Sequence, residues 1–430
     1  MSAALRIGLA GLGTVGCGVA ALLKENAALV TRRAGRPIQL VAVSARERQC
    51  QRSVDFTPYR WVDDAGALAL DEDIDAVVEL IGGSDGPALA LARATLKAGK
   101  PFITANKALI AHHGFELALA AEEAGATLAF EAAVAGGIPI LKALRHGLSA
   151  NAIDSVYGIF NGTCNYILSV MEREGHAFAE VLAEAQRLGY AEADPSFDID
   201  GIDTAHKTAI LAALAFGSRV RFDAVTVEGI RAISPIDIDY ALELGYRIKL
   251  LGIAKRDGVE VEQRVHPCLV AEAHPLAQVV GAFNAVVVEG DFVGRTVFEG
   301  AGAGAGPTAS AVVADLIDIA RGDIGPAFSV PASALDDLKA ADLACHRGRY
   351  YLRLTVEDKP GVVADIAAIL RDEGVSMESL IQRGSHANGG VFLVLTTHET
   401  TEAAIGRTVA KLARLASVMA PPVMLRIKAL

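Results

Sequence analysis

Two lysines of the sequence stand in settings that are unusual for surface residues. Lys107 follows a short apolar segment, and Lys207 lies near the start of an apolar helical segment from Asp203 to Phe216. Asp203 and Lys207 are four residues apart, so they would share one face of that helix. On an exposed helix such a pair contributes only about 0.2–0.5 kcal/mol. The rest of this helix is so rich in alanine and leucine that it would be buried on nearly all sides, which favours a polar pocket over a surface ion pair.

Acidic side chains precede the same helix. Glu192 and Asp194 belong to an acidic loop that runs to Asp203. Carboxylates in a polar pocket can bind the ammonium group of a substrate, and a lysine there can exchange a proton. With a hydride donor nearby, this combination of groups is typical of carbonyl reduction.

A glycine-rich turn near the N-terminus is a candidate site for such a donor. Gly11-Leu12-Gly13-Thr14-Val15-Gly16 matches G-x-G-x-x-G between a strand-like segment, Leu5 to Ala10, and a helical pattern that runs to Leu23. In dinucleotide sites these glycines let the backbone approach a pyrophosphate at a helix N-terminus. The alternative is an ordinary glycine-rich connection, but the position at the start of an alternating strand and helix pattern favours nucleotide binding.

The second predicted strand, Ile38 to Val43, bears on the choice of nucleotide. Sites specific for NAD usually have an acid at the tip of this strand, whereas here Ser44-Ala45-Arg46 follows. Ser44 and Arg46 could bind a 2′-phosphate, although an arginine on an exposed turn is also often only solvated. The sequence favours NADP, with NAD as the alternative.

The elements that must position these residues fall into a mixed α/β chain with three folded parts. Strands and helices alternate through residues 1–133, which predicts a doubly wound Rossmann sheet for NADP, completed by about 305–330. Residues 134–304 predict an α+β domain for substrate binding, catalysis and dimerisation, with β-rich stretches at Tyr246 to Val261 and Ala285 to Val288. We expect a linker at 331–349. Residues 350–430 show the strand and helix order of a ferredoxin-like fold.

The composition excludes several classes of protein. The chain has 430 residues, of which 52% are hydrophobic, and its 40 basic and 51 acidic residues give a formal net charge of -11. A general basic field for nucleic acid is therefore absent. The 5 cysteines are scattered, which argues against a disulfide framework or a zinc cluster. We expect a cytoplasmic protein with no targeting or membrane segment.

Seven segments together resemble one known family, the homoserine dehydrogenases, in the monofunctional form with a C-terminal ACT domain. The resemblance covers essentially the whole chain. The matching segments are Gly11 to Gly16, Thr104 to Lys107, Glu131 to Ile140, Phe160 to Leu168, Leu188 to Pro195, Asp200 to Lys207 and Gly300 to Ala311.

This resemblance implies the reversible reduction of L-aspartate 4-semialdehyde to L-homoserine, in the biosynthesis of threonine, methionine and isoleucine. It implies that Glu192 and Asp203 bind the substrate and that Lys207 donates and accepts the proton. Lys107 would contact the nicotinamide end and assist proton transfer. The implied cofactor-binding residues are Gly11, Gly13, Thr14, Val15, Gly16, Arg46, Lys107, Gly189, and Gly302 or Gly304.

The resemblance also implies a bound monovalent cation and a regulated assembly. Sodium or potassium would be held by Glu131 and by the carbonyl oxygens of Val134, Gly136 and Ile138, although Glu131 could equally be a structural acid that caps this loop. The ACT domain would bind an amino-acid effector such as threonine, or serve dimerisation alone. A homodimer or homotetramer is expected.

Two other functions compete with this interpretation. Aspartate-semialdehyde dehydrogenase would need a cysteine nucleophile with a partner histidine, and no cysteine, Cys164 included, has that sequence setting. A non-catalytic nucleotide-sensing regulator would explain the glycine-rich turn and the C-terminal domain but not the charged set around Lys207. We expect His206 to face away from the pocket, and His112 and His113 to be solvated.

Overall fold

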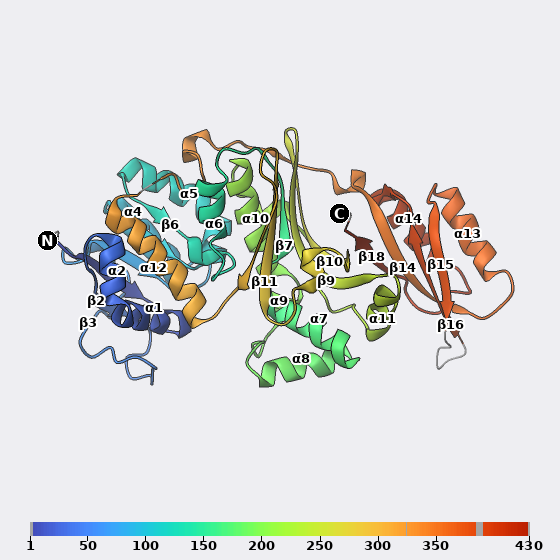
Figure 1. Ribbon diagram of the computed structural model, residues 1–430, viewed down its shortest axis with the longest axis horizontal. Coiled ribbons are helices and arrows are strands. Elements are labelled where there is room, and N and C mark those ends of the chain that lie inside the picture. Colours follow the sequence, from blue (N-terminus) through green and yellow to red (C-terminus); the bar gives the residue numbers. More distant parts are fainter. Residues whose placement is uncertain (1–2, 324, 384–389, 429–430) are drawn as a thin grey trace.

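Three folded parts follow one another along the long axis of the computed structural model, which describes residues 3–323, 325–383 and 390–428 (Figure 1). Residues 1–2, 324, 384–389 and 429–430 belong to the predicted ranges but lie outside the described residues. No helix within the described ranges is long and apolar enough to cross a bilayer.

The N-terminal part contains a 6-stranded parallel sheet in the order β3-β2-β1-β4-β5-β6. This order reverses between β1 and β4 and confirms the predicted doubly wound fold. The strands are β1 (Leu5–Ala10), β2 (Ile38–Ser44), β3 (Arg60–Trp61), β4 (Ala76–Glu79), β5 (Phe102–Thr104) and β6 (Leu128–Ala129). The helices of this part are α1 (Thr14–Glu25), α2 (Ala27–Ala34), α3 (Ala67–Leu70), α4 (Pro87–Lys97) and α5 (Lys107–Ala124).

Helix α12 (Ala305–Arg321) returns to this sheet from far along the chain and packs on α1. The two backbones lie close together, because a Cβ atom at Gly18 would be 2.4 Å from the carbonyl oxygen of Ala305. Leu316 and Val312 of α12 share a buried apolar cluster with strand β1. The glycine-rich segment before α12 is thereby held next to the nucleotide-binding turn.

The central part is built on the long strands of a 12-stranded sheet, whose order begins β12-β11-β7-β9-β10. The predicted β-rich stretches are parts of two longer hairpins. The prediction was too short because charged residues such as Glu262 and Arg264 interrupt the apolar pattern of the sequence. The strands are β7 (Ile153–Ile159), β8 (Thr226–Val227), β9 (Tyr246–Asp257), β10 (Glu260–Ala271), β11 (Phe283–Gly290) and β12 (Gly294–Ala301). The helices are α6 (Ile140–Lys142), α7 (Gly162–Glu174), α8 (Phe178–Arg187), α9 (Ser196–Ile199), α10 (Ile202–Phe216) and α11 (Pro235–Glu243).

Helix α10 lies between the central sheet and α5 of the N-terminal part. Its residues Ile210 and Leu211 belong to the same apolar cluster as Leu109 and Ile110 of α5. This shared core places the start of α10, with its charged residues, beside the start of α5.

The C-terminal part has the predicted ferredoxin-like order. Its elements are β14 (Arg347–Glu357), α13 (Val362–Asp372), β15 (Met377–Arg383), β16 (Gly390–Thr397), β17 (Thr400–Thr401), α14 (Glu402–Leu412) and β18 (Val423–Ile427). Strand β18 pairs with β10, so this sheet continues the central one. The buried Asp237 of α11 accepts hydrogen bonds from Arg353 (2.6 Å) and the Tyr351 hydroxyl (3.2 Å) of β14.

The segment predicted as a linker is partly structured. Strand β13 (Lys339–Ala340) pairs with β10, and β14 already begins at Arg347. The segment 331–349 is therefore not an unstructured linker, as expected, but contains strand residues. Backbone pairing to an existing strand produces such short elements without any strong side-chain pattern.

Candidate active site

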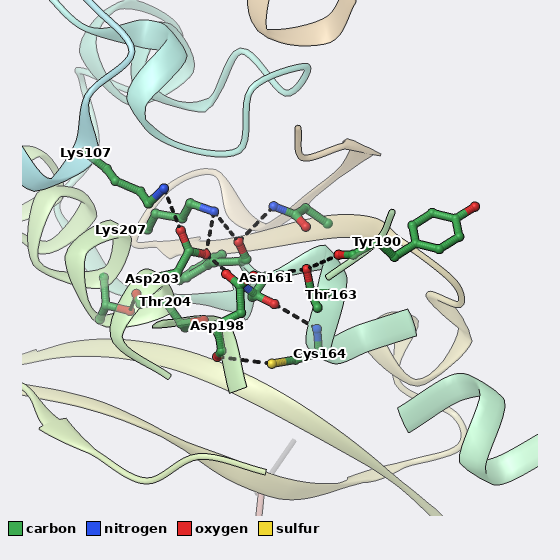
Figure 2. A network of polar contacts seen from close by, with 12 residues as sticks. Lys107, Asn161, Thr163, Cys164, Tyr190, Asp198, Asp203, Thr204 and Lys207 are labelled. Atoms are coloured by element: carbon green, nitrogen blue, oxygen red, sulfur yellow. Dashed lines mark hydrogen bonds and ion pairs between the residues drawn. The ribbon is translucent and has the colours of Figure 1, made fainter. Parts of the chain in front are cut away.

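A buried carboxylate joins the two lysines (Figure 2). Asp203 lies in the first turn of α10 and is only 3% exposed. One of its oxygens is 3.0 Å from Nζ of Lys107, and the other accepts a hydrogen bond of 2.8 Å from Nζ of Lys207. The structure therefore brings together three of the five charged residues singled out from the sequence.

The turn that follows β5 positions Lys107 at the first residue of α5. Asn106 caps this helix by accepting a hydrogen bond from the amide of Leu109, and its own amide donates to the carbonyl of Gly83. The hydroxyl of Thr104 donates to the buried carboxylate of Glu79 at 2.6 Å. These contacts fix the backbone from which the side chain of Lys107 reaches Asp203.

Lys207 and Asp203 contact the connection between β7 and α7, Phe160 and Asn161. Nζ of Lys207 donates a hydrogen bond of 2.7 Å to the carbonyl of Phe160, which also accepts one from the amide of Asn284. The amide of Asn161 donates to both Asp203 and Asp198 at 2.8 Å (Figure 2). Most of the buried polar groups of the site are therefore hydrogen-bonded, while Oδ1 of Asn284 and the hydroxyl of Thr204 have no partner among the described residues.

Electrostatics keep Asp203 ionised. Its charge raises the pKa of Lys107 above the usual range, against the opposing effect of burial. Burial alone would raise the pKa of Asp203, but Lys207 and Lys107 together hold that pKa well below its usual range. By contrast, burial and then the charge of Asp203 raise the pKa of Asp198. The site thus combines one ionised carboxylate with lysine side chains that can donate a proton.

Glu192 lies apart from this cluster. Its side chain is exposed, and its backbone carbonyl accepts a hydrogen bond from the side chain of Gln186. Asp198, which sequence reasoning missed, takes part in the buried network instead. The signal was present, because Asp198 belongs to the same acidic loop and its partner Asn161 belongs to a matched segment.

His112 is exposed, as expected, but the expectations for His206 and His113 were wrong. His206 is 3% exposed, and its Nε2 lies 3.3 Å from that of His112. His206 lines one cavity with His112 and Lys107, so it does not face away from the lysine site. Burial and then His112 lower the pKa of His206 to about 4, so the ring is neutral. His113 is half-buried and contacts Asp85 at 3.1 Å, a partner 28 residues away that sequence spacing does not reveal.

The glycine-rich turn borders a cleft of about 600 Å³ between the ends of β1, β2 and β4, and the cleft is lined among others by Gly11, Gly13, Ser44 and Arg46. Gly11 has φ +96°, and a Cβ atom there would be 2.3 Å from the carbonyl oxygen of Leu80. Gly13 has open space where a Cβ atom would lie, just before α1 begins at Thr14. A phosphate can therefore approach the first amides of α1, those of Thr14, Val15 and Gly16.

The other predicted glycines have structural reasons of their own. Gly189 follows α8 with φ +80°, and Gly304 precedes α12 with φ +117°. A Cβ atom at Gly302 would be 2.1 Å from the side-chain amide of Asn284, the residue that shares the carbonyl of Phe160 with Lys207. Gly302 is thus tied to the lysine site through Asn284.

Glu131 is buried and accepts hydrogen bonds from the amides of Leu141 (3.0 Å) and Lys142 (2.8 Å). Burial and the neighbouring Asp315 raise its pKa to about 7. Among the described residues, no group of three or more His, Cys, Asp or Glu side chains could hold a metal ion. A site made of one carboxylate and carbonyl oxygens needs no such group, and the segment with the Val134, Gly136 and Ile138 carbonyls runs directly from Glu131 to α6.

Two buried cysteines bear on the alternative enzyme. Cys164 donates to the carbonyl of Asp198 at 3.3 Å, and burial raises the pKa of its thiol. Cys268 lies 3.2 Å from Nδ1 of His266, a pair that the sequence did not suggest. The side chains of Cys268 and His266 are both buried in β10, and burial raises the pKa of the Cys268 thiol to about 11. Neither thiol is an accessible nucleophile, so nothing here favours acyl transfer.

A doubly wound sheet with an open glycine-rich turn, next to a buried lysine–carboxylate–lysine cluster, defines a nicotinamide-nucleotide-dependent oxidoreductase. Residues 139–317 match the family model for homoserine dehydrogenase, residues 11–131 its NAD binding domain, and residues 350–416 the ACT domain. The chain belongs to the homoserine dehydrogenase family.

Full-length relatives support this membership. The chain is 45% identical to homoserine dehydrogenase of Pseudomonas aeruginosa, with 99% of each chain covered. It is 47% identical to that of Neisseria gonorrhoeae, again with 99% of each covered. A crystal structure of homoserine dehydrogenase from Thiobacillus denitrificans is similar with a TM-score of 0.94 and 46% identity, over 99% of this chain and 98% of that one.

Proposed function

We propose that the chain catalyses the reversible reduction of L-aspartate 4-semialdehyde to L-homoserine, and so serves threonine, methionine and isoleucine biosynthesis. The observation that carries this proposal is the contact of Lys107 and Lys207 with opposite oxygens of Asp203. Family membership supports the substrate. Nothing in the structure favours a non-catalytic regulator, which would not need two lysines in contact with one buried carboxylate.

Lys207 is the proposed proton donor and acceptor. An ammonium group has three N–H donors, and two of them are directed at Asp203 and at the carbonyl of Phe160. The third remains to hydrogen-bond the substrate oxygen and to protonate it as negative charge develops. Lys107, on the other side of Asp203, adds positive charge at the nicotinamide end of the site.

Asp203 and Glu192 are the proposed partners of the substrate's ammonium group. Asp203 is fixed in place, whereas the exposed side chain of Glu192 is available to turn toward a bound amino acid. Such contacts orient the aldehyde toward the nucleotide, and orientation alone can contribute a large part of a rate enhancement.

NADP is the proposed cofactor, with NAD as the alternative. When bound, it supplies the hydride. The residues fit it: Gly11 and Gly13 open the turn, the amides of Thr14, Val15 and Gly16 can receive a pyrophosphate, and Arg46 lines the cleft beyond β2. Gly189 and Gly302 or Gly304 would approach the cofactor from the central part. A hyperthermophilic archaeal homoserine dehydrogenase, 25% identical with a TM-score of 0.65 over 76% of this chain, was solved with NADPH, which supports this choice.

The Arg46→Asp variant tests the choice of nucleotide. An acid at this position would repel a 2′-phosphate, so we expect the specificity constant for NADP relative to NAD to fall about tenfold. Steady-state kinetics with both cofactors give this ratio. Arg48→Ala removes the same charge two residues away as a control. An unchanged ratio in the Arg46 variant would show that Arg46 faces solvent.

Glu131, with the carbonyl oxygens of Val134, Gly136 and Ile138, is the proposed holder of a sodium or potassium ion. The residues fit such an ion, because the buried Glu131 carboxylate has no ion pair among the described residues and its pKa is raised to about 7. A hard monovalent cation would favour its ionised form. The proposed role of the ion is structural, because it would hold the segment between Glu131 and α6 that connects the N-terminal part to the central part.

The C-terminal ACT domain is the proposed site for an amino-acid effector such as threonine, in a homodimer or homotetramer located in the cytoplasm. An effector can act only if it prefers one state of the assembly. The test uses the full chain, because removal of β14 would leave the buried Asp237 without Arg353. Activity should fall as threonine is added, and calorimetry should detect binding. If threonine and related amino acids neither bind nor inhibit, the domain serves assembly alone.

A turnover assay tests the function itself. With L-homoserine and NADP the purified chain should produce reduced cofactor and aspartate semialdehyde. With aspartate semialdehyde, phosphate and NADP it should not, because Cys164, the cysteine beside the lysine site, is buried and cannot serve as the nucleophile of acyl transfer. Reduction of neither nucleotide by homoserine would contradict the proposal.

A further inference from the structure

Two arginines approach the single tryptophan of the chain in a pocket beside the nucleotide cleft, and Arg52 lines both. The guanidinium carbons of Arg48 and Arg52 lie 5.5 Å and 5.6 Å from the ring centre of Trp61. The hydrogen bonds of the two side chains differ. Within the described residues Arg48 donates no hydrogen bond from its guanidinium, whereas Arg52 donates four.

All four acceptors of Arg52 are backbone carbonyl oxygens. Nε donates to Leu12 at 3.2 Å, one terminal nitrogen donates to Arg48 (3.2 Å) and Cys50 (3.0 Å), and the other donates to Glu47. Leu12 belongs to the glycine-rich turn, and the other three belong to the segment that follows β2. Arg52 therefore ties the pyrophosphate turn to the segment that carries Arg46.

We infer that Arg52 is a positioning residue for recognition of the 2′-phosphate. A guanidinium has five N–H donors, and four of them are used on the backbone, so Arg52 is not primarily a phosphate ligand itself. Its action is to hold residues 45–50 in the conformation that presents Arg46 and Ser44 to the adenosine end of the cofactor. This inference rests on the proposed use of NADP.

The positive charge of Arg52 alone would not hold residues 45–50 in this conformation. A lysine at the same position keeps the positive charge and the approach to Trp61, but it has one nitrogen and cannot bridge four carbonyls on two segments. The Arg52→Lys variant therefore separates positioning from charge. Arg48→Lys is the matched control. Arg48 belongs to the same segment and also approaches the Trp61 ring, but its guanidinium donates no hydrogen bond to a backbone carbonyl among the described residues.

The experiment measures binding of two probes to the full chain, adenosine 2′,5′-bisphosphate and adenosine 5′-monophosphate, by the fluorescence of Trp61 and by calorimetry. We expect Arg52→Lys to lower the affinity ratio of the two probes about tenfold, and Arg48→Lys to leave it within roughly twofold of the unaltered chain. Amide hydrogen exchange of residues 45–50 should become faster only in Arg52→Lys.

Two outcomes would overturn the inference. If Arg52→Lys keeps the ratio, or weakens both probes equally, Arg52 does not govern recognition of the 2′-phosphate. If the unaltered chain binds the two probes with equal affinity, the choice of NADP fails, and the inference fails with it. Thermal unfolding of each variant shows that the protein remains folded.

Discussion

Asp203 and Glu131 are both buried acids near the joint between the N-terminal and central parts, yet burial has opposite results for them. Two lysines contact Asp203 and hold its pKa well below the usual range. Glu131 receives two backbone amides, and burial together with Asp315 raises its pKa to about 7. Direct contact with two lysines outweighs burial at Asp203, whereas the two amide hydrogen bonds of Glu131 do not outweigh burial and the charge of Asp315. Asp203 is therefore an anion at neutral pH, whereas the Glu131 carboxyl is partly protonated there.

The largest expected effect comes from removing one cation at Asp203. Lys207→Ala should lower turnover by about 10²–10⁴, the usual contribution of a general acid or base, while the nucleotide cleft is unaffected. Steady-state kinetics and NADPH binding measure the two properties separately. Lys207→Met, which keeps most of the apolar volume in buried α10, controls for packing. Less than a tenfold loss in a folded variant would remove Lys207 from the proton transfer.

Removing the other cation should have the next largest effect. Lys107→Ala leaves Asp203 with Lys207 alone and takes positive charge from the nicotinamide end, so we expect turnover to fall about 10–10²-fold, with weaker cofactor binding. The exposed Lys97→Ala serves as the control for a lost lysine. A normal turnover rate would make Lys107 a structural residue.

A smaller effect is expected at Glu131, and it depends on pH. Its pKa is about 7 in the folded chain against an ordinary value of 4.5, so the folded state binds more protons between these values. The free energy of unfolding should therefore decrease as pH rises from 4.5 to 7 in the absence of sodium and potassium. Glu131→Gln should remove this part of the slope, and the exposed Glu123→Gln should not.

Urea unfolding at a series of pH values provides the measurement. Added sodium or potassium should flatten the same slope in the unaltered chain, because the ion favours the ionised carboxylate, and should have no such effect in Glu131→Gln. Identical profiles for the unaltered chain and Glu131→Gln would show that Glu131 titrates normally. They would also remove the reason to place a cation there.

The comparison also shows what the sequence could predict. The pairing of Asp203 with Lys207 follows from helical spacing, and the Rossmann and ferredoxin-like folds follow from the order of apolar segments and the glycine-rich turn. The contact of Lys107 with Asp203 joins residues far apart in the chain and depends on how α5 packs against α10. Such contacts have no local pattern, so only the folded structure reveals them.

Chemical rescue of Lys207→Ala tests the central claim most directly. If Lys207 exchanges the proton, small primary amines entering the space left by its side chain should restore part of the turnover with homoserine and NADP, in proportion to amine basicity and concentration. Lys107→Ala, whose lysine is proposed to act mainly through its charge, should recover less. The account predicts an amine-dependent rate in Lys207→Ala. A variant that binds cofactor and substrate normally, yet shows no response to any amine, would contradict it.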